Sequence, residues 1–257
     1  MSGFAKPTPD ADVLGRAQDP RRAPAVGNIW PKTMPRKISI AIDGPAGAGK
    51  TTVAHEVARR LGYKYIDTGA MYRAVAWKSL QVGVSLEDAD HIARLAGRMK
   101  IEFRDGDGSR IFADGVDVSR AIRTPEVSRL SSPVSAIPGV RRHLVALQQR
   151  LGALGGVVME GRDIGSVVMP DAEVKVFLTA SVGERARRRL ADLAQSGVQV
   201  SLEALKKEIE ERDRRDSTRE HSPLVRVPDA VEISTDGLEV DRVVEKIICL
   251  CRERMSG

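Results

Sequence analysis

The stretch from residue 44 to residue 51 constrains this chain more than any other part of its sequence. It reads GPAGAGKT and fits the phosphate-binding pattern G-x-x-x-x-G-K-[ST] at every fixed position. Residues 37–43, an apolar run rich in β-branched side chains, precede it and predict a buried parallel strand. Residues 51–61 follow with apolar side chains four apart, and Gly62 stands where a helix commonly ends. Strand, glycine-rich turn and helix together indicate the opening of a β-α-β unit.

The composition of this loop explains how it would hold a nucleotide. Small residues let backbone N–H groups curl around a phosphate, and the helix N-terminus adds partial positive charge. Lys50 would bring a full charge to the outer phosphates, and Thr51 would hold Mg²⁺ through its hydroxyl. The expected ATP-binding residues are Gly44, Pro45, Ala46, Gly47, Ala48, Gly49, Lys50, Thr51 and Thr52. A glycine-rich turn that binds nothing is the alternative, and the flanking strand and helix argue against it.

The rest of the chain continues the alternation of short apolar strands and helices. Further parallel strands are predicted at residues 63–66, 156–160, 172–178 and 230–234. The expected fold class is α/β, a P-loop NTPase fold in which helices flank a five-stranded parallel sheet.

Between residues 84 and 151 the pattern changes. Residues 100–104 and 110–113 predict two strands of a hairpin joined by a turn at 105–108, and residues 140–151 predict an amphipathic helix. An antiparallel hairpin within a parallel pattern indicates an inserted subdomain.

Switches, motors and small kinases all use a phosphate loop, so other features must separate these classes. GTP-binding switches typically read guanine with Asn-Lys-x-Asp, whereas the single asparagine of this chain, Asn28, lies in the N-terminal tail. A motor would place an acidic residue at the end of a hydrophobic strand, as Glu160 stands here. Glu160 leads directly into residues 161–163, Gly-Arg-Asp, which suggests a loop that faces a ligand. A small kinase is the class that fits best.

Three polar segments are candidates for the acceptor side of such a site. In residues 67–73 a hydroxyl, a phenol and a guanidinium come together beside a strand end, where α/β sheets bind ligands. Residues 161–165 add an arginine and an aspartate, and residues 212–219 form a stripe of arginines at helical spacing. Helix capping and a solvated, salt-bridged helix are the ordinary alternatives. A phosphoryl-transfer enzyme nevertheless needs arginines to neutralise the transferring group.

In their order along the chain, five blocks resemble the bacterial cytidylate kinase family. They are residues 42–51 (IDGPAGAGKT), 67–73 (DTGAMYR), 122–127 (IRTPEV), 161–165 (GRDIG) and 212–219 (RDRRDSTR). The resemblance spans essentially residues 38–254 and is far more specific than the phosphate loop alone. It implies transfer of the γ-phosphoryl group of ATP to CMP or dCMP, assisted by Mg²⁺.

The resemblance also implies roles for individual residues. Those expected to hold the monophosphate are Thr68, Tyr72, Arg73 and Arg162, and those expected to recognise cytosine are Ser132, Arg141 and Asp163. From the lid side, Arg212, Asp216 and Arg219 would reach the acceptor sugar or the transferring phosphates. The expected catalytic residues are Lys50, Arg162, Arg212, Arg215 and Arg219. A carboxylate beside a guanidinium suits cytosine, which offers an amino donor and an N3 acceptor, whereas uracil reverses both.

The expected domain organisation follows from the same comparison. We expect residues 1–36 to form a disordered N-terminal extension and residues 37–257 to form the kinase domain. Within that domain we expect a core at about residues 37–83 and 152–257, an inserted NMP-binding subdomain at about 84–151 and a short lid at about 212–226.

Charge and composition limit the other partners. The formal net charge is +6, and half of it lies in residues 1–36, which hold six basic and three acidic side chains. Because aromatic residues make up only 4% of the chain, stacking platforms for single-stranded nucleic acid are scarce and we expect no nucleic-acid partner. Two cysteines, no secretory leader and no long apolar run predict a cytosolic protein without a membrane partner. The family resemblance favours a monomer.

Two alternatives remain open at this stage. One is another small P-loop kinase, which acts on uridylate or on a non-nucleotide such as shikimate. The cytosine-side residues Ser132, Arg141 and Asp163 discriminate between it and a cytidylate kinase, and a substrate panel decides. A nucleotide-binding regulator or RNA-binding module would use the basic tail, and removing residues 1–36 would then abolish RNA binding without loss of kinase activity.

Overall fold

The computed structural model describes residues 37–104, 110–153, 155–195 and 198–256. The expected disordered extension at residues 1–36 and the expected turn at 105–108 lie outside these residues. Residues 36–257 form one compact unit. In the described part of the chain, no helix is both long and apolar enough to cross a membrane.

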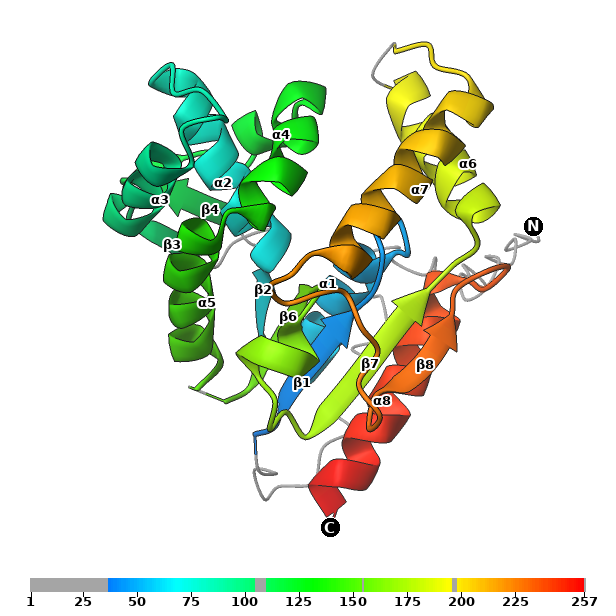
Figure 1. The fold of residues 1–257 in the computed structure, drawn as a ribbon. Helices are drawn as coiled ribbons and strands as arrows, with labels where there is room; N and C mark the ends of the chain where they lie inside the picture. Colours follow the sequence, from blue (N-terminus) through cyan, green and yellow to red (C-terminus); the bar gives the residue numbers. More distant parts are fainter. Residues whose placement is uncertain (1–36, 105–109, 154, 196–197, 257) are drawn as a thin grey trace, which may run out of the picture. The chain divides into compact units, whose positions relative to one another are not determined.

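Within the described residues, a five-stranded parallel sheet has the order β2-β6-β1-β7-β8 (Figure 1). The strands are β1 (Ser39–Asp43), β2 (Lys64–Asp67), β6 (Val157–Gly161), β7 (Val174–Thr179) and β8 (Val231–Ser234). The expected five-stranded parallel sheet is thus confirmed, with β1 between β6 and β7. Because the strands are parallel, their carboxyl ends meet at one edge, where Asp43 pairs with Gly161.

Helices cover both faces of the sheet. Ile40 and Ile42 point to the face covered by α1 (Lys50–Leu61) and α8 (Val240–Ser256). Ala41 points to the opposite face, as the two-residue period of a strand requires, and packs with the short π-helical turn η2 (Ile164–Val168).

The antiparallel insert forms a separate hydrophobic cluster. Its elements are α2 (Thr68–Gln81), α3 (Ala89–Arg98), β3 (Ile101–Arg104), β4 (Arg110–Ala113), β5 (Val116–Asp117), η1 (Ala121–Arg123), α4 (Pro125–Ala136) and α5 (Pro138–Gly152). The structure contains the expected hairpin as β3 and β4, and adds β5 to it. Buried residues of α2, from Ala70 onward, belong to this cluster. The packing of the insert therefore begins before residue 84.

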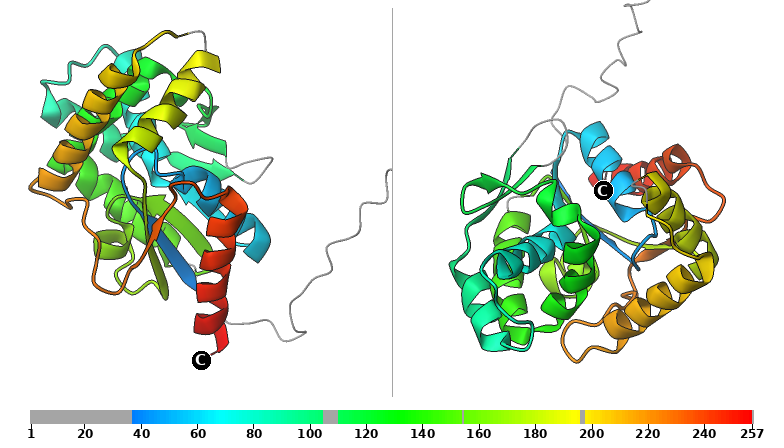
Figure 2. Two further views of the ribbon diagram at one scale, coloured as in Figure 1. Left: turned by 90° about the vertical axis from the view of Figure 1, so that its right-hand side faces the viewer. Right: turned by 90° about the horizontal axis from the view of Figure 1, so that it is seen from above.

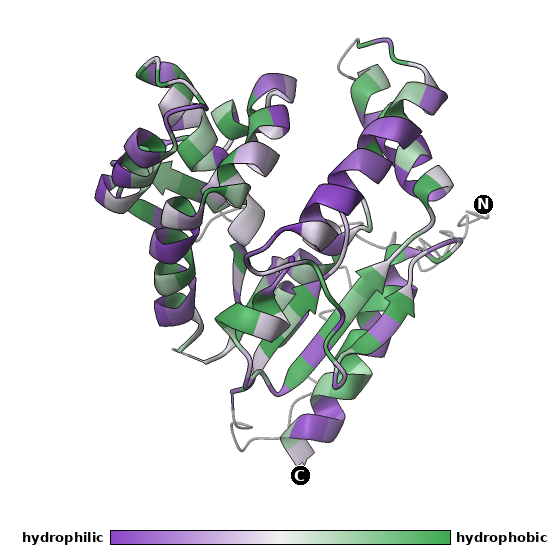
Figure 3. Ribbon diagram, in the orientation of Figure 1, coloured by the Kyte–Doolittle hydropathy of each residue, from purple (hydrophilic) through white to green (hydrophobic). Residues whose placement is uncertain are grey.

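Two helices form a hairpin beyond the carboxyl edge of the sheet. Figures 1 and 2 show α6 (Val182–Gln195) and α7 (Leu202–Thr218) side by side. Ala186, Leu193, Leu205 and Ile209 pack between them. In Figure 3 the surface of α7 is mostly hydrophilic, whereas the central strands are mostly hydrophobic.

Candidate active site

The phosphate loop joins β1 to α1, and its glycines take conformations that other residues rarely adopt. Gly44 has a φ of 146°, and a Cβ atom there would lie 1.9 Å from the carbonyl oxygen of Leu178. Gly49, with a φ of 86°, stands at the N-cap of α1, whose first N–H groups receive no side-chain cap from the described residues. These N–H groups are therefore available to an anion.

Lys50 is a buried cation at the start of α1. Its side-chain Nζ donates to the carbonyl oxygen of Pro45 at 2.8 Å, and the residue is 6% exposed. Burial lowers the pKa of the ammonium group, and the charge of Arg162 lowers it further, whereas Glu160 raises it. A bound phosphate would favour the charged form because it supplies the opposite charge.

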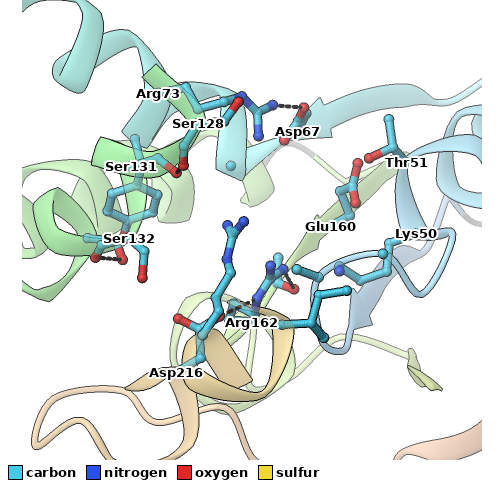
Figure 4. A pocket seen from close by; sticks show the side chains of 18 of the residues that line it. Lys50, Thr51, Asp67, Arg73, Ser128, Ser131, Ser132, Glu160, Arg162 and Asp216 are labelled. Carbon is cyan, nitrogen blue, oxygen red and sulfur yellow. Dashed lines mark hydrogen bonds and ion pairs between the residues drawn. The ribbon is translucent and has the colours of Figure 1, made fainter. Parts of the chain in front are cut away.

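Oxygen atoms gather beside the loop at the end of β6. The Tyr65 phenol donates to the Glu160 carboxylate, and the Thr51 hydroxyl lies within hydrogen-bonding reach of the same carboxylate (Figure 4). Burial raises the pKa of Glu160, and the negative charge of Asp67 raises it further. A divalent cation next to these oxygens would favour the ionised carboxylate.

This donor set fits Mg²⁺ that arrives with a nucleotide. Hydroxyl and carboxylate oxygens, such as those of Thr51 and Glu160, are the ligand types that Mg²⁺ prefers. Among the described residues no group of three or more His, Cys, Asp or Glu side chains forms a closed metal site. Mg²⁺ usually takes one or two protein ligands and completes its shell with phosphates and water.

The acceptor side begins where β2 passes into α2. Asp67 accepts the N–H of Ala70 at 2.8 Å through one carboxylate oxygen and pairs with Arg73 at 2.6 Å through the other. Thr68 donates its hydroxyl to the carbonyl oxygen of Glu160 at 2.7 Å. The buried Nε of Arg73 has no partner within the described residues. Asp67 thus both caps the helix and orients a guanidinium that keeps free donors.

A buried ion pair between Arg141 and Asp163 lies deeper on this side. The two side chains are only 5% and 6% exposed. The Arg141 guanidinium lies 5.5 Å from the centroid of the Tyr72 ring, and its buried Nε lacks a partner in the described part of the chain. Burial raises the pKa of Tyr72 to about 12. A buried pair that keeps a free donor is suited to hydrogen-bond a polar ligand.

The third side of the site comes from α7 and the residues after it. Arg162 pairs with Asp216 at 3.0 Å, and Arg219 lies 3.7 Å from Asp163. Burial lowers the pKa of Arg212 to about 10, and the positive charge of Arg162 lowers it further. A bound anion would reduce the repulsion between the Arg162 and Arg212 guanidinium groups.

All three sides line one cavity of about 540 Å³. Among the described residues, ten basic and six acidic side chains line it. The expected site residues that line it are Ala46, Gly47, Gly49, Lys50, Thr51, Thr52, Thr68, Tyr72, Arg73, Ser132, Arg141, Arg162, Asp163, Arg212, Asp216 and Arg219. Figure 4 shows Lys50 and Thr51 on one side, Ser132 on the other and Arg162 between them.

Four expected residues are placed differently. Gly44, Pro45 and Ala48 form the buried inner side of the loop. Arg215 is exposed, donates to the carbonyl oxygen of Glu211 at 3.4 Å and is absent from the lining of this cavity. The structure therefore does not bring Arg215 to the site.

Three arginines of α6 that were not predicted from the sequence also line the cavity, namely Arg185, Arg188 and Arg189. Arg185 donates to the phosphate-loop carbonyl of Ala46 at 3.2 Å and pairs with Asp213 of α7 at 2.6 Å. In the sequence these arginines follow the strand predicted at residues 172–178, which ends at the same sheet edge as the other site residues. That position could have indicated them as site residues.

The parallel sheet, the phosphate loop and the arginine-lined cavity define a protein of the P-loop class. The sequence profile of the family described as cytidylate kinase matches residues 40–253. The chain therefore belongs to the cytidylate kinase family.

Two relatives agree with this placement. A bifunctional pantoate ligase/cytidylate kinase of Synechococcus sp. (strain JA-2-3B'a(2-13)) is 53% identical over 237 residues, which cover 91% of this chain and 43% of that protein. A cytidylate kinase of Desulfitobacterium hafniense (strain Y51) is 46% identical over 87% of this chain and 96% of its own length. The chain thus spans less than half of the bifunctional relative. A solved shikimate kinase from Acinetobacter baumannii, in complex with shikimate, has a TM-score of 0.45 and 16% identity over 85% of this chain and 94% of its own.

Proposed function

We propose that this protein transfers the γ-phosphoryl group of ATP to the phosphate of CMP or dCMP. One observation carries the proposal: a single cavity has a phosphate loop at one end and the buried Arg141–Asp163 pair at the other. Membership of the cytidylate kinase family supports cytidine nucleotides as the acceptors.

The donor end would hold the triphosphate of ATP. The N–H groups at the start of α1 would donate to phosphate oxygens, and Lys50 would compensate the charge of the outer phosphates. Thr51 and Glu160 are the residues that would hold Mg²⁺. The bound cation would neutralise charge on the β- and γ-phosphate oxygens.

The acceptor end would hold CMP by charge and by hydrogen bonds. Arg73 and Arg162 would grip the monophosphate, because a guanidinium offers a planar fork of donors to phosphate oxygens. Asp163 would accept from the cytosine amino group and Arg141 would donate to its acceptor atoms. Uracil reverses this pattern and would leave buried groups unpaired, which is the basis of selection.

Positioning and charge compensation account for the transfer step. The attacking atom is a phosphate oxygen that is already ionised near neutral pH, so the site needs no general base. Arg162, Arg212 and Arg219 would compensate the charge that spreads over the transferring group. Closure of the α6–α7 hairpin would exclude water and so limit ATP hydrolysis.

We also infer the organisation and setting of the protein. The sheet and its helices form the core, the α2–α5 insert binds the monophosphate, and the α6–α7 hairpin with the residues after it acts as the lid. Both cysteines are free thiols, which supports a reducing compartment such as the cytoplasm. We propose that the protein acts as a monomer.

An acceptor panel tests this function. Purified protein would be incubated with Mg-ATP and CMP, dCMP, AMP, GMP, shikimate or no acceptor, and ADP and the phosphorylated product would be quantified. We expect ADP to form only with CMP or dCMP, together with an equal amount of CDP or dCDP. ATP hydrolysis that is indifferent to the acceptor would overturn the proposal.

A further inference from the structure

A carboxylate outside the expected site residues connects the phosphate loop to the acceptor loop. Asp43 is the last residue of β1 and directly precedes Gly44. It is 7% exposed. Its two oxygens accept the backbone N–H groups of Ile164 and Gly165 at 2.8 Å each. These partners lie 121 and 122 positions further along the chain.

The two N–H groups belong to the turn that follows the cytosine-side aspartate. Ile164 and Gly165 open η2, and the first N–H groups of a helix have no partner within it. The carbonyl oxygen of Asp163 accepts the N–H of Val167 at 2.9 Å and that of Val168 at 3.2 Å. The turn therefore fixes the carbonyl of Asp163, while Asp43 fixes the N–H groups after it.

Side chains from two strands lie around this contact. A Cβ atom at Gly165 would lie 3.3 Å from the Lys175 side chain and 3.5 Å from an Asp43 oxygen. The parallel pairing of Asp43 with Gly161 aligns the two strand ends on which both loops begin. The acceptor loop thus has little freedom to shift while Asp43 accepts both hydrogen bonds.

From this geometry we infer that Asp43 is a positioning residue for the acceptor, because it holds the loop that presents Arg162 and Asp163 to CMP. The inference rests on the proposed function. In this role Asp43 contacts neither nucleotide. It affects the binding of CMP through the backbone of residues 163–165.

The side chain matches this task better than a neutral one would. Two consecutive N–H groups require two acceptor atoms, which a carboxylate supplies. An asparagine of the same size supplies one acceptor and turns a donor toward the second N–H group. Asp43→Asn therefore removes one hydrogen bond while it keeps the volume.

Steady-state kinetics of Asp43→Asn and Asp43→Ala test the inference, with CMP and ATP varied separately. We expect the KM for CMP to rise by about tenfold or more, because a displaced loop no longer aligns Arg162 and Asp163 with the acceptor. The KM for ATP should change much less than that for CMP, since the lost hydrogen bonds go to the acceptor loop and only the charge of Asp43 acts on Lys50. The matched control is Glu173→Gln. Glu173 accepts the N–H of Ser39 at 2.9 Å at the opposite end of β1, and both KM values should stay at the wild-type level.

A second variant covers the case in which substitutions of Asp43 do not fold. Gly165→Val keeps Asp43 and adds two methyl groups beyond a Cβ position that already lies 3.3 Å from Lys175 and 3.5 Å from an Asp43 oxygen, and it should raise the KM for CMP in the same direction. Equal rises in both KM values, or wild-type kinetics in folded variants, would contradict the inference while wild-type turnover of CMP upholds the function. A wild-type protein that neither binds CMP in calorimetry nor phosphorylates it would overturn both.

Discussion

Asp163 and Arg141 form the most deeply buried ion pair described near the site. Removing one partner of such a pair leaves an uncompensated charge, which typically costs about 3–5 kcal/mol of stability. Asp163→Ala should therefore lower both the kcat/KM for CMP and the melting temperature. A variant that keeps a hydrogen-bond acceptor for Arg141 separates the two effects.

Asp163→Asn provides that separation. Its amide can still accept from Arg141, but it can also donate to a base, so it no longer favours cytosine over uracil. We expect the kcat/KM for CMP to fall by roughly 10²-fold or more and that for UMP to fall much less. Kinetics with both acceptors measure this, and an unchanged CMP-to-UMP ratio would remove Asp163 from base recognition.

The raised pKa of Asp43 predicts that the stability of the folded protein depends on pH. Burial raises its pKa from 3.8 to about 6, and the nearby Asp163 charge adds to the rise, while the hydrogen bonds from Gly165 and Ile164 oppose it. Because the pKa is higher in the folded protein than in the unfolded chain, protonation of Asp43 stabilises the fold. This contribution is complete below the unfolded-state pKa of 3.8 and is lost as pH rises through about 6.

Urea unfolding of the wild type and Asp43→Asn measures this contribution. From about pH 7.5 to about pH 5 the wild type should gain on the order of 1–3 kcal/mol relative to the variant. A difference between the two unfolding free energies that does not change with pH would show that the pKa of Asp43 is not raised by folding, and a change in the opposite direction would show that folding lowers it.

At the scale of elements, the α6–α7 hairpin carries cavity-lining arginines over the phosphate loop. Arg185 connects three parts of the structure, because it donates to Ala180 at 2.9 Å and Ala46 at 3.2 Å and pairs with Asp213 at 2.6 Å. Arg185 is 4% exposed and Asp213 is 24% exposed. The pair therefore fixes the position of α7 over the donor end of the cavity.

Asp213→Ala should loosen this hairpin. The loss of a partly buried charged hydrogen bond costs about 1–3 kcal/mol, and we expect faster amide exchange in α7 and more ATP hydrolysis without acceptor. Glu203→Gln is the control, because Glu203 pairs with Lys206 on the same helix at 2.8 Å but is 75% exposed. Equal exchange rates in the two variants would show that the Arg185 pair does not hold α7.

At the scale of the whole molecule, the local part of the architecture could be predicted from the sequence. The strand, loop and helix at residues 37–61 follow from spacing within a few residues, and so does the hairpin of the insert. Contacts between distant segments could not be predicted in this way. Nothing near Asp43 in the sequence indicates Ile164 as its partner, and nothing in α2 indicates that it packs with the insert.

The arginine stripe illustrates the same limit within the site. Helical spacing groups Arg212, Arg215 and Arg219, but α7 ends at Thr218, so Arg219 reaches the cavity from beyond the helix. Arg215 is exposed instead. Where a helix ends depends on packing and capping, which a spacing rule does not contain.

The excess of positive charge around the cavity predicts that anionic ligands stabilise the whole protein. ADP with CMP, each at about 100 times its Kd, should together raise the melting temperature by roughly 10–20 °C. Inorganic phosphate should raise it more than sodium chloride of equal ionic strength does, because the arginines would bind it directly. Thermal unfolding measures both effects, and equal shifts with phosphate and chloride would exclude an organised phosphate site.

In the proposed function, the Arg141–Asp163 pair selects the pyrimidine monophosphate that the protein phosphorylates. A competition assay with equimolar CMP and UMP in one reaction with Mg-ATP, followed by chromatography of the diphosphates formed, measures this selection. We expect an excess of CDP over UDP of about hundredfold or more, as for a site built on buried hydrogen bonds. Comparable amounts of CDP and UDP would contradict a role of this pair in selecting the base.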